Sequence, residues 1–135
     1  MNISNTISNF IVKVYYEDTD AAGIVYHSKY LNFAERARTE FLKNIGCYQS
    51  IIYKENKIRF VVRKLKIDYT GYAILDDSLK VTTCIKFINK AKIIFLQKII
   101  KKSKILTNIE VIVCCIKENG TVARMPNELY YKIIN

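Results

Sequence analysis

Residues 15–40 read YYEDTDAAGIVYHSKYLNFAERARTE, and this stretch carries the strongest structural signal in the chain. Its beginning continues an alternating segment, residues 11–17, in which Val12, Val14 and Tyr16 share one face. Alternation of this kind predicts a β-strand with one buried face. We therefore expect a strand to lead into the rest of the stretch.

The second half of the stretch has the spacing of a helix. From Ser28 onward, apolar residues recur every three or four positions, at Tyr30, Phe33, Ala34, Ala37, Phe41 and Leu42. This period places them on one face of an amphipathic helix. Ser28 is a suitable N-cap, and Gly46 is a suitable C-terminal stop. The two alanines indicate that the helix packs closely against a sheet.

Between the strand and the helix lie three carboxylates, Glu17, Asp18 and Asp20, and a glycine-containing loop. A helix start presents backbone N–H groups that have no acceptor within the helix, and these bind a negatively charged oxygen well. A carboxylate beside such donors can hydrolyse an acyl compound without a Ser-His-Asp triad. The loop is therefore a candidate active site, although an Asp20 that only caps the turn would give the same pattern.

The rest of the chain shows a short helix or loop at residues 47–56 and then four strands at hairpin spacing. We expect these strands at residues 58–69, 79–87, 91–101 and 107–117. In the first of them the apolar residues change parity near Val62 and Arg63, which predicts a bulge. The nearly continuous apolar run at residues 109–116 predicts an interior strand.

The order strand, long helix, four strands predicts an α+β fold, an antiparallel sheet with its helices on one face. The only proline, Pro126, is expected to end the last strand region. A single long helix leaves one sheet face and one strand edge uncovered. A homodimer is the usual way to cover them.

The composition is that of one globular domain, residues 1–135. Half of the residues are hydrophobic and a quarter are charged. The longest apolar run, residues 93–100, is interrupted by Gln97 and Lys98 and is shorter than the ~18 residues of a membrane span. The first ten residues lack the basic and apolar regions of a signal peptide. We expect a cytoplasmic protein without an integral membrane segment.

The net charge of +10 invites a polyanionic partner. The lysines are scattered over many segments, however, and a chain rich in Lys, Ile and Asn carries this charge through composition alone. No aromatic–basic RNA motif or helix-turn-helix pattern is visible, so a nucleic acid partner is not expected. A phosphorylated cofactor or an acidic acyl carrier protein is the simplest functional explanation.

The sequence contains four cysteines, Cys47, Cys84, Cys114 and Cys115, and a single histidine, His27. No Cys-x-x-Cys pair is present, and one histidine offers little to a metal ion. We expect the cysteines to be buried free thiols and expect no metal site.

Residues 15–40, together with FVVRK at residues 60–64 and LDD at residues 75–77, closely resemble the Tol–Pal-associated acyl-CoA thioesterases. These are a branch of the 4-hydroxybenzoyl-CoA thioesterase-like hotdog proteins. The resemblance covers nearly the whole chain and weakens after about residue 117. It implies a hotdog fold, in which a five-stranded antiparallel sheet wraps a long helix, assembled as a homodimer or homotetramer with sites at subunit interfaces. It also implies hydrolysis of acyl-CoA thioesters, of short or medium aliphatic chains, without a cofactor.

Carried onto this sequence, the resemblance places the catalytic aspartate at Asp20. It places the amide that polarises the thioester carbonyl at the backbone N–H of His27. Gly23 matches the glycine that lets the loop turn tightly. Asp20 can serve as a nucleophile or as a general base for water, and the residues leave both roles open. The role of the His27 imidazole is open as well.

Four further residues are candidates for substrate binding. Tyr26, Tyr30 and Val61 are candidates for the lining of the acyl pocket. Arg63 lies where CoA phosphates or a partner subunit could be met, although a solvated strand surface explains it equally well.

Two other functions are compatible with a hotdog fold. Hotdog dehydratases need a histidine paired with a second acid or base in a different motif, and this chain does not offer that arrangement. A non-catalytic module would hold an acyl chain or an acyl carrier protein in its groove. The intact loop from Asp20 to His27 favours an enzyme over such a module.

Overall fold

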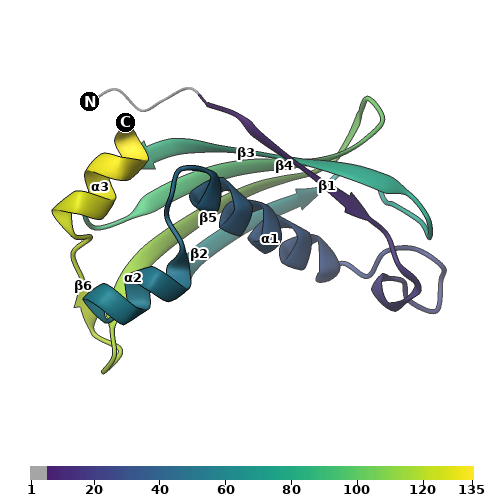
Figure 1. Ribbon diagram of the computed structural model, residues 1–135. Helices are drawn as coiled ribbons and strands as arrows, with labels where there is room; N and C mark the ends of the chain where they lie inside the picture. The colour runs from purple at the N-terminus through teal and green to yellow at the C-terminus, as the bar shows by residue number, and fades with distance from the viewer. Residues whose placement is uncertain (1–5) are drawn as a thin grey trace.

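The computed structural model describes residues 6–135, in which one antiparallel sheet and three α-helices form the fold (Figure 1). In chain order the elements are β1 (Ser8–Lys13), the 3₁₀ helix η1 (Tyr16–Asp18), α1 (Lys29–Asn44), α2 (Gln49–Asn56), β2 (Ile58–Tyr69), β3 (Ser78–Ile88), β4 (Ile93–Lys101), β5 (Lys104–Lys117), β6 (Val122–Ala123) and α3 (Asn127–Ile134).

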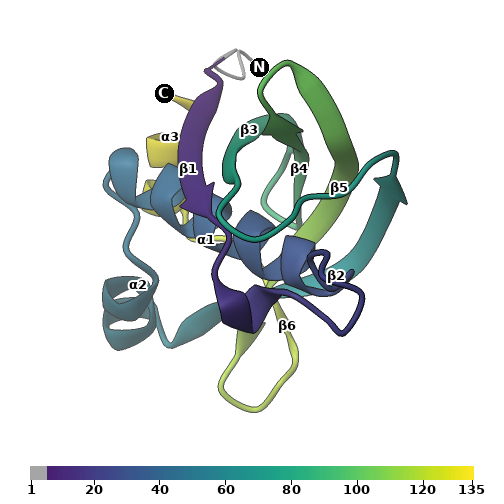
Figure 2. The ribbon, with the colours of Figure 1, turned by 90° about the vertical axis from the view of Figure 1, so that its right-hand side faces the viewer.

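The sheet has the order β1-β3-β4-β5-β2, and every pairing in it is antiparallel. It curves around α1, which lies on its concave side (Figure 2). This confirms the expected α+β architecture of a long helix wrapped by a sheet. A sixth strand, the two-residue β6, pairs with β5 beyond the five expected strands.

Helix α1 and the sheet bury the core between them. The six apolar residues predicted to share one helix face are all buried. Ala34 and Ala37 have almost no exposed surface, so their small side chains let the helix approach the sheet closely. Gly46 ends the helix with a φ of 83°, and the following N–H, from Cys47, donates to the Leu42 carbonyl at 2.8 Å.

Two finer predictions about the sheet, the bulge and the interior strand, are confirmed. The register of β2 on β5 shifts between Val62 and Lys64, which confirms the bulge. Strand β5 lies between β4 and β2, which confirms the interior strand. All four cysteines are free; three are buried, and Cys84 is half-buried.

The prediction for residues 11–17 was wrong in its second half. Strand β1 ends at Lys13, and Tyr16 is 82 % exposed instead of lying on the buried face with Val12 and Val14. The Asp18 carboxylate accepts the N–H of Tyr15 at 2.9 Å, which closes the 3₁₀ turn. A local side-chain acceptor therefore ends the strand earlier than the alternation indicates.

The C-terminal helix α3 was missed by sequence reasoning. Pro126 was expected to end the last strand region, but β6 already ends at Ala123, and Pro126 instead occupies the N-cap position of α3, where its missing N–H costs nothing. Leu129 and Ile133, four residues apart, are the buried positions of this short helix. Within residues 6–135, no helix is long and apolar enough to cross a membrane.

Candidate active site

A tight loop connects η1 to α1 and carries the candidate catalytic residues. An isolated bridge between Thr19 and Val25 closes its base. Within it, the Asp20 N–H donates to the Ile24 carbonyl at 2.9 Å, and the Gly23 N–H donates to the Asp20 carbonyl at 3.0 Å. Gly23 has a φ of 82°, a conformation that favours glycine. A Cβ added there would meet no atom within 4 Å, so backbone conformation and not crowding explains the glycine in the single chain.

The loop is anchored to the segment between β2 and β3. The Val25 N–H donates to the Ala73 carbonyl at 2.9 Å, and Ile24 forms a bridge with Ile74. The Ala73 N–H in turn donates to the Tyr30 hydroxyl at 3.0 Å. The first turn of α1 and the loop therefore share one support, which holds their relative position.

The Asp20 side chain is half-buried within this loop. One carboxylate oxygen, Oδ1, accepts the N–H of Ala22 at 2.9 Å. The carboxylate therefore does cap the turn, as one interpretation of the sequence proposed. That bond uses only one of the two oxygens, so the second is free to act on a substrate.

His27 lies two residues before the first residue of α1. Its backbone N–H donates no hydrogen bond to any of residues 6–135. Its imidazole is exposed and contacts the Tyr26 ring, with the centroids 4.4 Å apart and the ring planes tilted by 50°. An unpaired N–H at a helix start is suited to a developing oxyanion, because the helix dipole adds to the donor.

Tyr69, at the end of β2, holds this peptide in place and was missed by sequence reasoning. Its hydroxyl donates to the His27 carbonyl at 2.7 Å. Burial raises the pKa of Tyr69, so the hydroxyl remains a donor at neutral pH. The tyrosine ring also packs edge-on against Tyr30, with centroids 5.7 Å apart. The sequence signal that could have identified Tyr69 was its position at the end of a predicted strand, among the alternating residues whose side chains face the helix.

The other acidic residues of the stretch have structural positions. Asp18 is buried, caps the 3₁₀ turn and lies 4.0 Å from the Lys29 ammonium. Its backbone carbonyl also accepts the Tyr26 N–H at 2.9 Å, which links the 3₁₀ helix to the start of α1. Glu17 is exposed.

Of the two tyrosines proposed for the pocket lining, only one is accessible. Tyr26 is exposed beside His27. Tyr30 is 2 % exposed, and its hydroxyl is occupied by the Ala73 N–H. Burial raises the pKa of Tyr30, although the hydrogen bond from Ala73 opposes the shift. In the single chain Tyr30 is therefore a core residue that supports the site.

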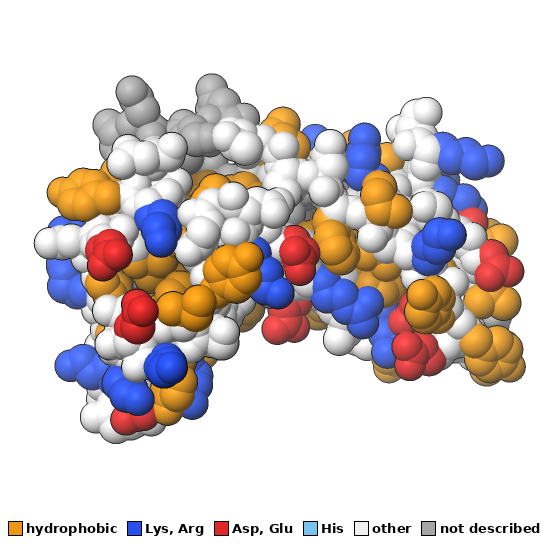
Figure 3. Space-filling view, in the orientation of Figure 1, with side chains coloured by type: hydrophobic (Ala, Val, Ile, Leu, Met, Phe, Trp, Pro, Cys, Tyr) orange, Lys and Arg blue, Asp and Glu red, His pale blue; other side chains and the backbone are white. Residues whose placement is uncertain are grey.

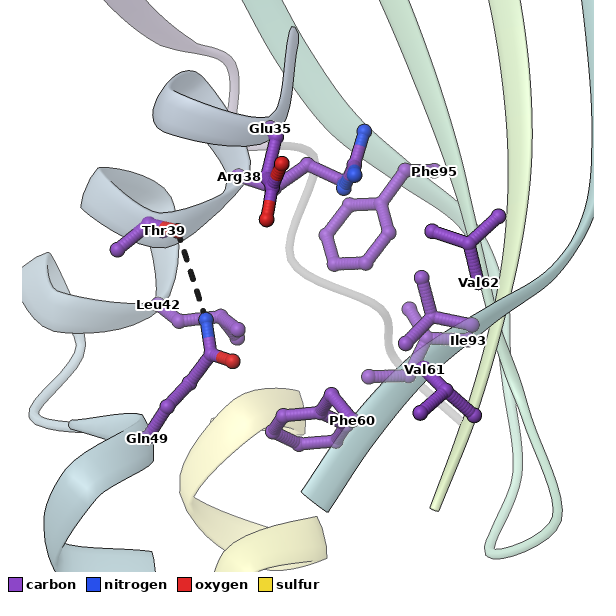
Figure 4. Close-up of a pocket in the computed structure, with 11 residues that line it drawn as sticks. Glu35, Arg38, Thr39, Leu42, Gln49, Phe60, Val61, Val62, Ile93 and Phe95 are labelled. Carbon is purple, nitrogen blue, oxygen red and sulfur yellow. Dashed lines mark hydrogen bonds between the residues drawn. The ribbon is translucent and has the colours of Figure 1, made fainter. Parts of the chain in front are cut away.

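Val61 and Arg63 do not lie with the catalytic loop of their own chain. Val61 lines a pocket of about 120 Å³ between α1 and the first half of β2, where Phe60 and Val62 face Thr39 and Leu42 (Figure 4). Arg63 is exposed at the bulge. His27 is tied to the far end of β2, so Val61 lies eight residues, or about 26 Å, back along the strand.

The loop thus offers one free carboxylate oxygen and one free N–H donor on a rigid support. Within residues 6–135, no group of three or more His, Cys, Asp or Glu side chains is placed to hold a metal ion. A carboxylate and an oxyanion donor suffice for attack on an activated carbonyl, which needs a nucleophile or base on one side and an electrophile on the other.

Comparison with known proteins agrees with this chemistry. The chain is 44% identical over 108 residues to acyl-CoA thioesterase YbgC of Haemophilus influenzae, covering 80% of this chain and 79% of the relative. It is 41% identical over 115 residues to acyl-CoA thioester hydrolase YbgC of Escherichia coli O157:H7, covering 84% and 85%. A probable thioesterase from Bartonella henselae superposes with a TM-score of 0.86 at 33% identity, covering 90% of this chain and all of the other.

A family model matches residues 14–133, which include the loop, helices α1 and α2 and every strand of the sheet except β1. That model describes the thioesterase-like superfamily. The free carboxylate, the open amide and this match together assign the family. The chain belongs to the thioesterase-like superfamily, with the hotdog fold.

Proposed function

We propose that this protein hydrolyses acyl-CoA thioesters of short or medium aliphatic chains to the free acid and CoA. The observation that carries the proposal is the pairing, on one anchored loop, of the Asp20 carboxylate with the unpaired N–H of His27. Relatives of 41–44% identity that are named acyl-CoA thioesterases support the same substrate class.

The reaction follows from these two groups. The thioester carbonyl oxygen accepts the His27 N–H, which stabilises negative charge on that oxygen in the transition state. The free oxygen of Asp20 then acts in one of two ways. As a nucleophile it displaces the CoA thiolate and forms an acyl anhydride that water cleaves; as a general base it takes a proton from water, which attacks the carbonyl directly.

The site is completed, in this proposal, by a second copy of the chain in a homodimer or homotetramer. Strand β2 is twelve residues long and pairs only with β5 among the described strands, so its outer edge is open. Helix α1 packs against β1, β3 and β4, which leaves Val62, Leu65 and Tyr69 of β2 at least 38 % exposed. Pairing of two β2 edges would cover both the open edge and these apolar residues.

Such a dimer gives Val61 a role. In an antiparallel β2–β2 pair, the first half of one strand lies beside the last half of the other. The Val61 pocket of one chain would then lie beside the Asp20–His27 loop of its partner. Its volume of about 120 Å³ suits a short acyl chain, and Phe60, Val61 and Val62 offer it apolar contacts, although Glu35, Arg38, Thr39 and Gln49 also line the pocket.

The branch of the family, the cellular location and the carrier of the acyl group are part of the same proposal. The match over residues 15–40 supports the Tol–Pal-associated branch of the family, acting in the cytoplasm on soluble acyl-CoA. An acyl group carried on an acyl carrier protein is a second possible form of the substrate, since the chemistry at the carbonyl is the same.

A panel of acyl-CoAs from two to twelve carbons, assayed with a thiol reagent, tests the function directly. We expect steady release of CoA, fastest for the shorter chains, and a smaller or equal rate with acyl carrier protein thioesters. Tight acyl-CoA binding without CoA release would instead identify a non-catalytic module.

Sedimentation equilibrium tests the assembly. We expect a mass of two or four chains of 15.7 kDa at micromolar concentration. Full activity from a species of single-chain mass would refute a shared site. Leu65→Lys should weaken the dimer because it places a charge at the apolar edge, whereas the control Ile11→Lys, at an exposed apolar residue on β1, should not.

A further inference from the structure

An open cleft lies at the end of the molecule opposite the catalytic loop. It has a volume of about 540 Å³ and lies between the α2–β2 junction and the β5–β6 hairpin, which adjoin in Figure 1. Three of its lining residues are cationic, Lys57, Lys117 and Arg124, and Glu118 is the only acidic one. Lys and Arg side chains gather over this end at the lower left of Figure 3.

The cations of the cleft are not neutralised by the protein. Within residues 6–135, none of Lys57, Lys117 and Arg124 has a carboxylate within 4.0 Å, and the same holds for the adjacent Arg59. The carboxylate of Glu118 is instead held by the Tyr53 hydroxyl at 2.6 Å. The cleft therefore has a surplus of positive charge and spare N–H donors, which suits a multiply charged anion.

Tyr53 also organises the cationic side chains beside the cleft. The Arg59 guanidinium lies 3.9 Å from the centroid of the Tyr53 ring, and the Lys57 ammonium lies 5.4 Å from it. Arginine stacked on an aromatic ring keeps its planar fork of donors in a defined orientation. Other cations also lie over aromatic rings, at 5.7–5.9 Å, so the short Arg59–Tyr53 contact is what distinguishes this end of the molecule.

The two ends of β2 connect the cleft to catalysis. Ile58, the first residue of β2, lines the cleft, and Tyr69, the last, holds the His27 carbonyl. If two β2 edges pair in opposite directions, the cleft of one chain lies beside the catalytic loop of the other. A ligand that reaches from that loop across the interface meets the cations of the partner chain.

We propose that this cleft binds the phosphate groups of the CoA whose thioester reacts at the Asp20–His27 loop of the partner subunit. The proposal rests on the proposed thioesterase function. CoA carries a 3′-phosphate and a pyrophosphate at one end and the thioester at the other, so a site for both ends must place cations away from the reacting carbonyl. The cleft at the Ile58 end of β2 meets that need across the interface, with Lys57, Lys117 and Arg124 all lacking a carboxylate partner among residues 6–135. A second lysine-lined cleft, beside Tyr72 beyond the Tyr69 end of β2, belongs to the same chain as the loop, and its Lys101 is paired with Asp77 at 2.8 Å.

Kinetics with three thioesters of one acyl group test the assignment. The cleft variant Arg59→Gln/Arg124→Gln is compared with the control variant Lys80→Gln/Lys98→Gln, which removes the same charge from exposed positions on β3 and β4. The acyl group is carried on CoA, on 3′-dephospho-CoA and on pantetheine, which has no phosphate. We expect the cleft variant to raise KM for acyl-CoA about tenfold with kcat unchanged. Its KM for the pantetheine thioester should equal that of the parent.

Two outcomes would contradict the assignment of the cleft to the CoA phosphates. Equal losses in the cleft and control variants would assign the effect to total charge, and equal losses with CoA and pantetheine would assign it to folding or the catalytic loop. Calorimetric binding of free CoA to the same variants needs no turnover. It therefore decides the cleft assignment even if the parent hydrolyses none of the thioesters, a result that would refute only the proposed function.

Mixed dimers test the sharing between subunits. Asp20→Asn and the cleft variant are co-expressed with different tags, and the dimer carrying both tags is purified. If one chain supplies the loop and the other the cleft, this dimer contains one complete site. It should show about half the parental kcat at the parental KM. A KM as high as that of the cleft variant would place cleft and loop of one chain in the same site and overturn the proposal.

Discussion

In the described part of the chain, polar groups lack protein partners at the start of α1 but are hydrogen-bonded to protein groups beside its middle. At the start, the His27 N–H has no acceptor among residues 6–135, and one oxygen of Asp20 is free. Beside the middle of the helix, Gln97 of β4 is 1 % exposed, and both ends of its side-chain amide form hydrogen bonds. Its Nε2 donates to the Ala34 carbonyl at 2.9 Å and to the Thr83 hydroxyl at 3.0 Å, while its Oε1 accepts a hydrogen bond from Arg38 at 3.0 Å.

The difference follows from exposure to water. A buried polar group without a partner loses the full free energy of its hydration, so the core network closes on itself. At the exposed start of α1 water replaces a missing partner, so open groups are tolerated and remain available to a substrate. Burial also lowers the pKa of Arg38, with Glu35 opposing the shift, yet an arginine stays charged. The start of the helix is therefore built for binding and the middle for stability.

The largest test of this contrast is Asp20→Asn. Asparagine keeps an Oδ1 that can accept the Ala22 N–H, so the turn cap survives while the charge is lost. We expect kcat to fall ~10²-fold or more with the thermal midpoint nearly unchanged. Asp76→Asn, at another turn with a φ of 71°, is the control and should keep parental turnover. Turnover of the Asp20 variant within a few-fold of the parent would leave the carboxylate only its capping role.

The converse test is Gln97→Leu in the middle of the helix. Leucine removes the partner of Arg38 and Thr83, and each polar group left unpaired costs roughly 1–3 kcal/mol of unfolding free energy. We expect a large loss of stability in urea unfolding, with kcat of the remaining folded protein within a few-fold of the parent. Gln49→Leu changes an exposed amide and should alter stability by only about 0.5 kcal/mol. A stable Gln97 variant would show that the core network contributes little.

A smaller effect is expected for Tyr69→Phe, which removes only the hydrogen bond to the His27 carbonyl. Such a bond contributes about 0.5–1.5 kcal/mol, so kcat should fall by at most about tenfold. Since the hydroxyl positions a peptide and does not bind the substrate, KM should stay near the parental value. Tyr72→Phe, an exposed tyrosine before Ala73, is the control. Equal rates in both variants would mean that the loop keeps its geometry without Tyr69.

The last effect, which is absent at neutral pH, concerns two thiols that differ in burial. Burial, with a further contribution from Cys114, raises the pKa of Cys115 from 9.0 to about 11. The folded chain therefore holds this proton where the unfolded chain has lost it. The free energy of unfolding should be unaffected by this group below pH 9 and should decrease between pH 9 and 11.

Urea unfolding at pH 7, 9, 10 and 11 measures this dependence. Cys115→Ala should show a shallower decline than the parent, apart from a constant loss of packing. Cys84→Ala, at a half-buried thiol, should decline as the parent does. Identical slopes in the two variants would remove Cys115 as a cause of the decline.

Features that depend on local periodicity were predictable. The three- and four-residue spacing after Ser28 predicts α1, and the parity change at Val62 predicts the bulge. Both patterns depend only on residues that are close together along the chain. The early end of β1 was not predictable, because the Asp18 carboxylate competes with strand pairing for the Tyr15 N–H. Helix α3 was missed because eight residues with two buried positions give a weak periodic signal.

Local sequence patterns were enough to predict the strand–loop–helix order, the antiparallel sheet and the loop that carries Asp20, Gly23 and His27. These features depend on short-range spacing and on residue types suited to one backbone conformation. The packing of the chain was needed to show that Tyr69 supports His27, that Tyr30 belongs to the core, and that Val61 lies at the other end of β2. Such relations join residues up to 42 positions apart, and they are set by sheet register and by the packing of the helix on the sheet, which no local pattern records.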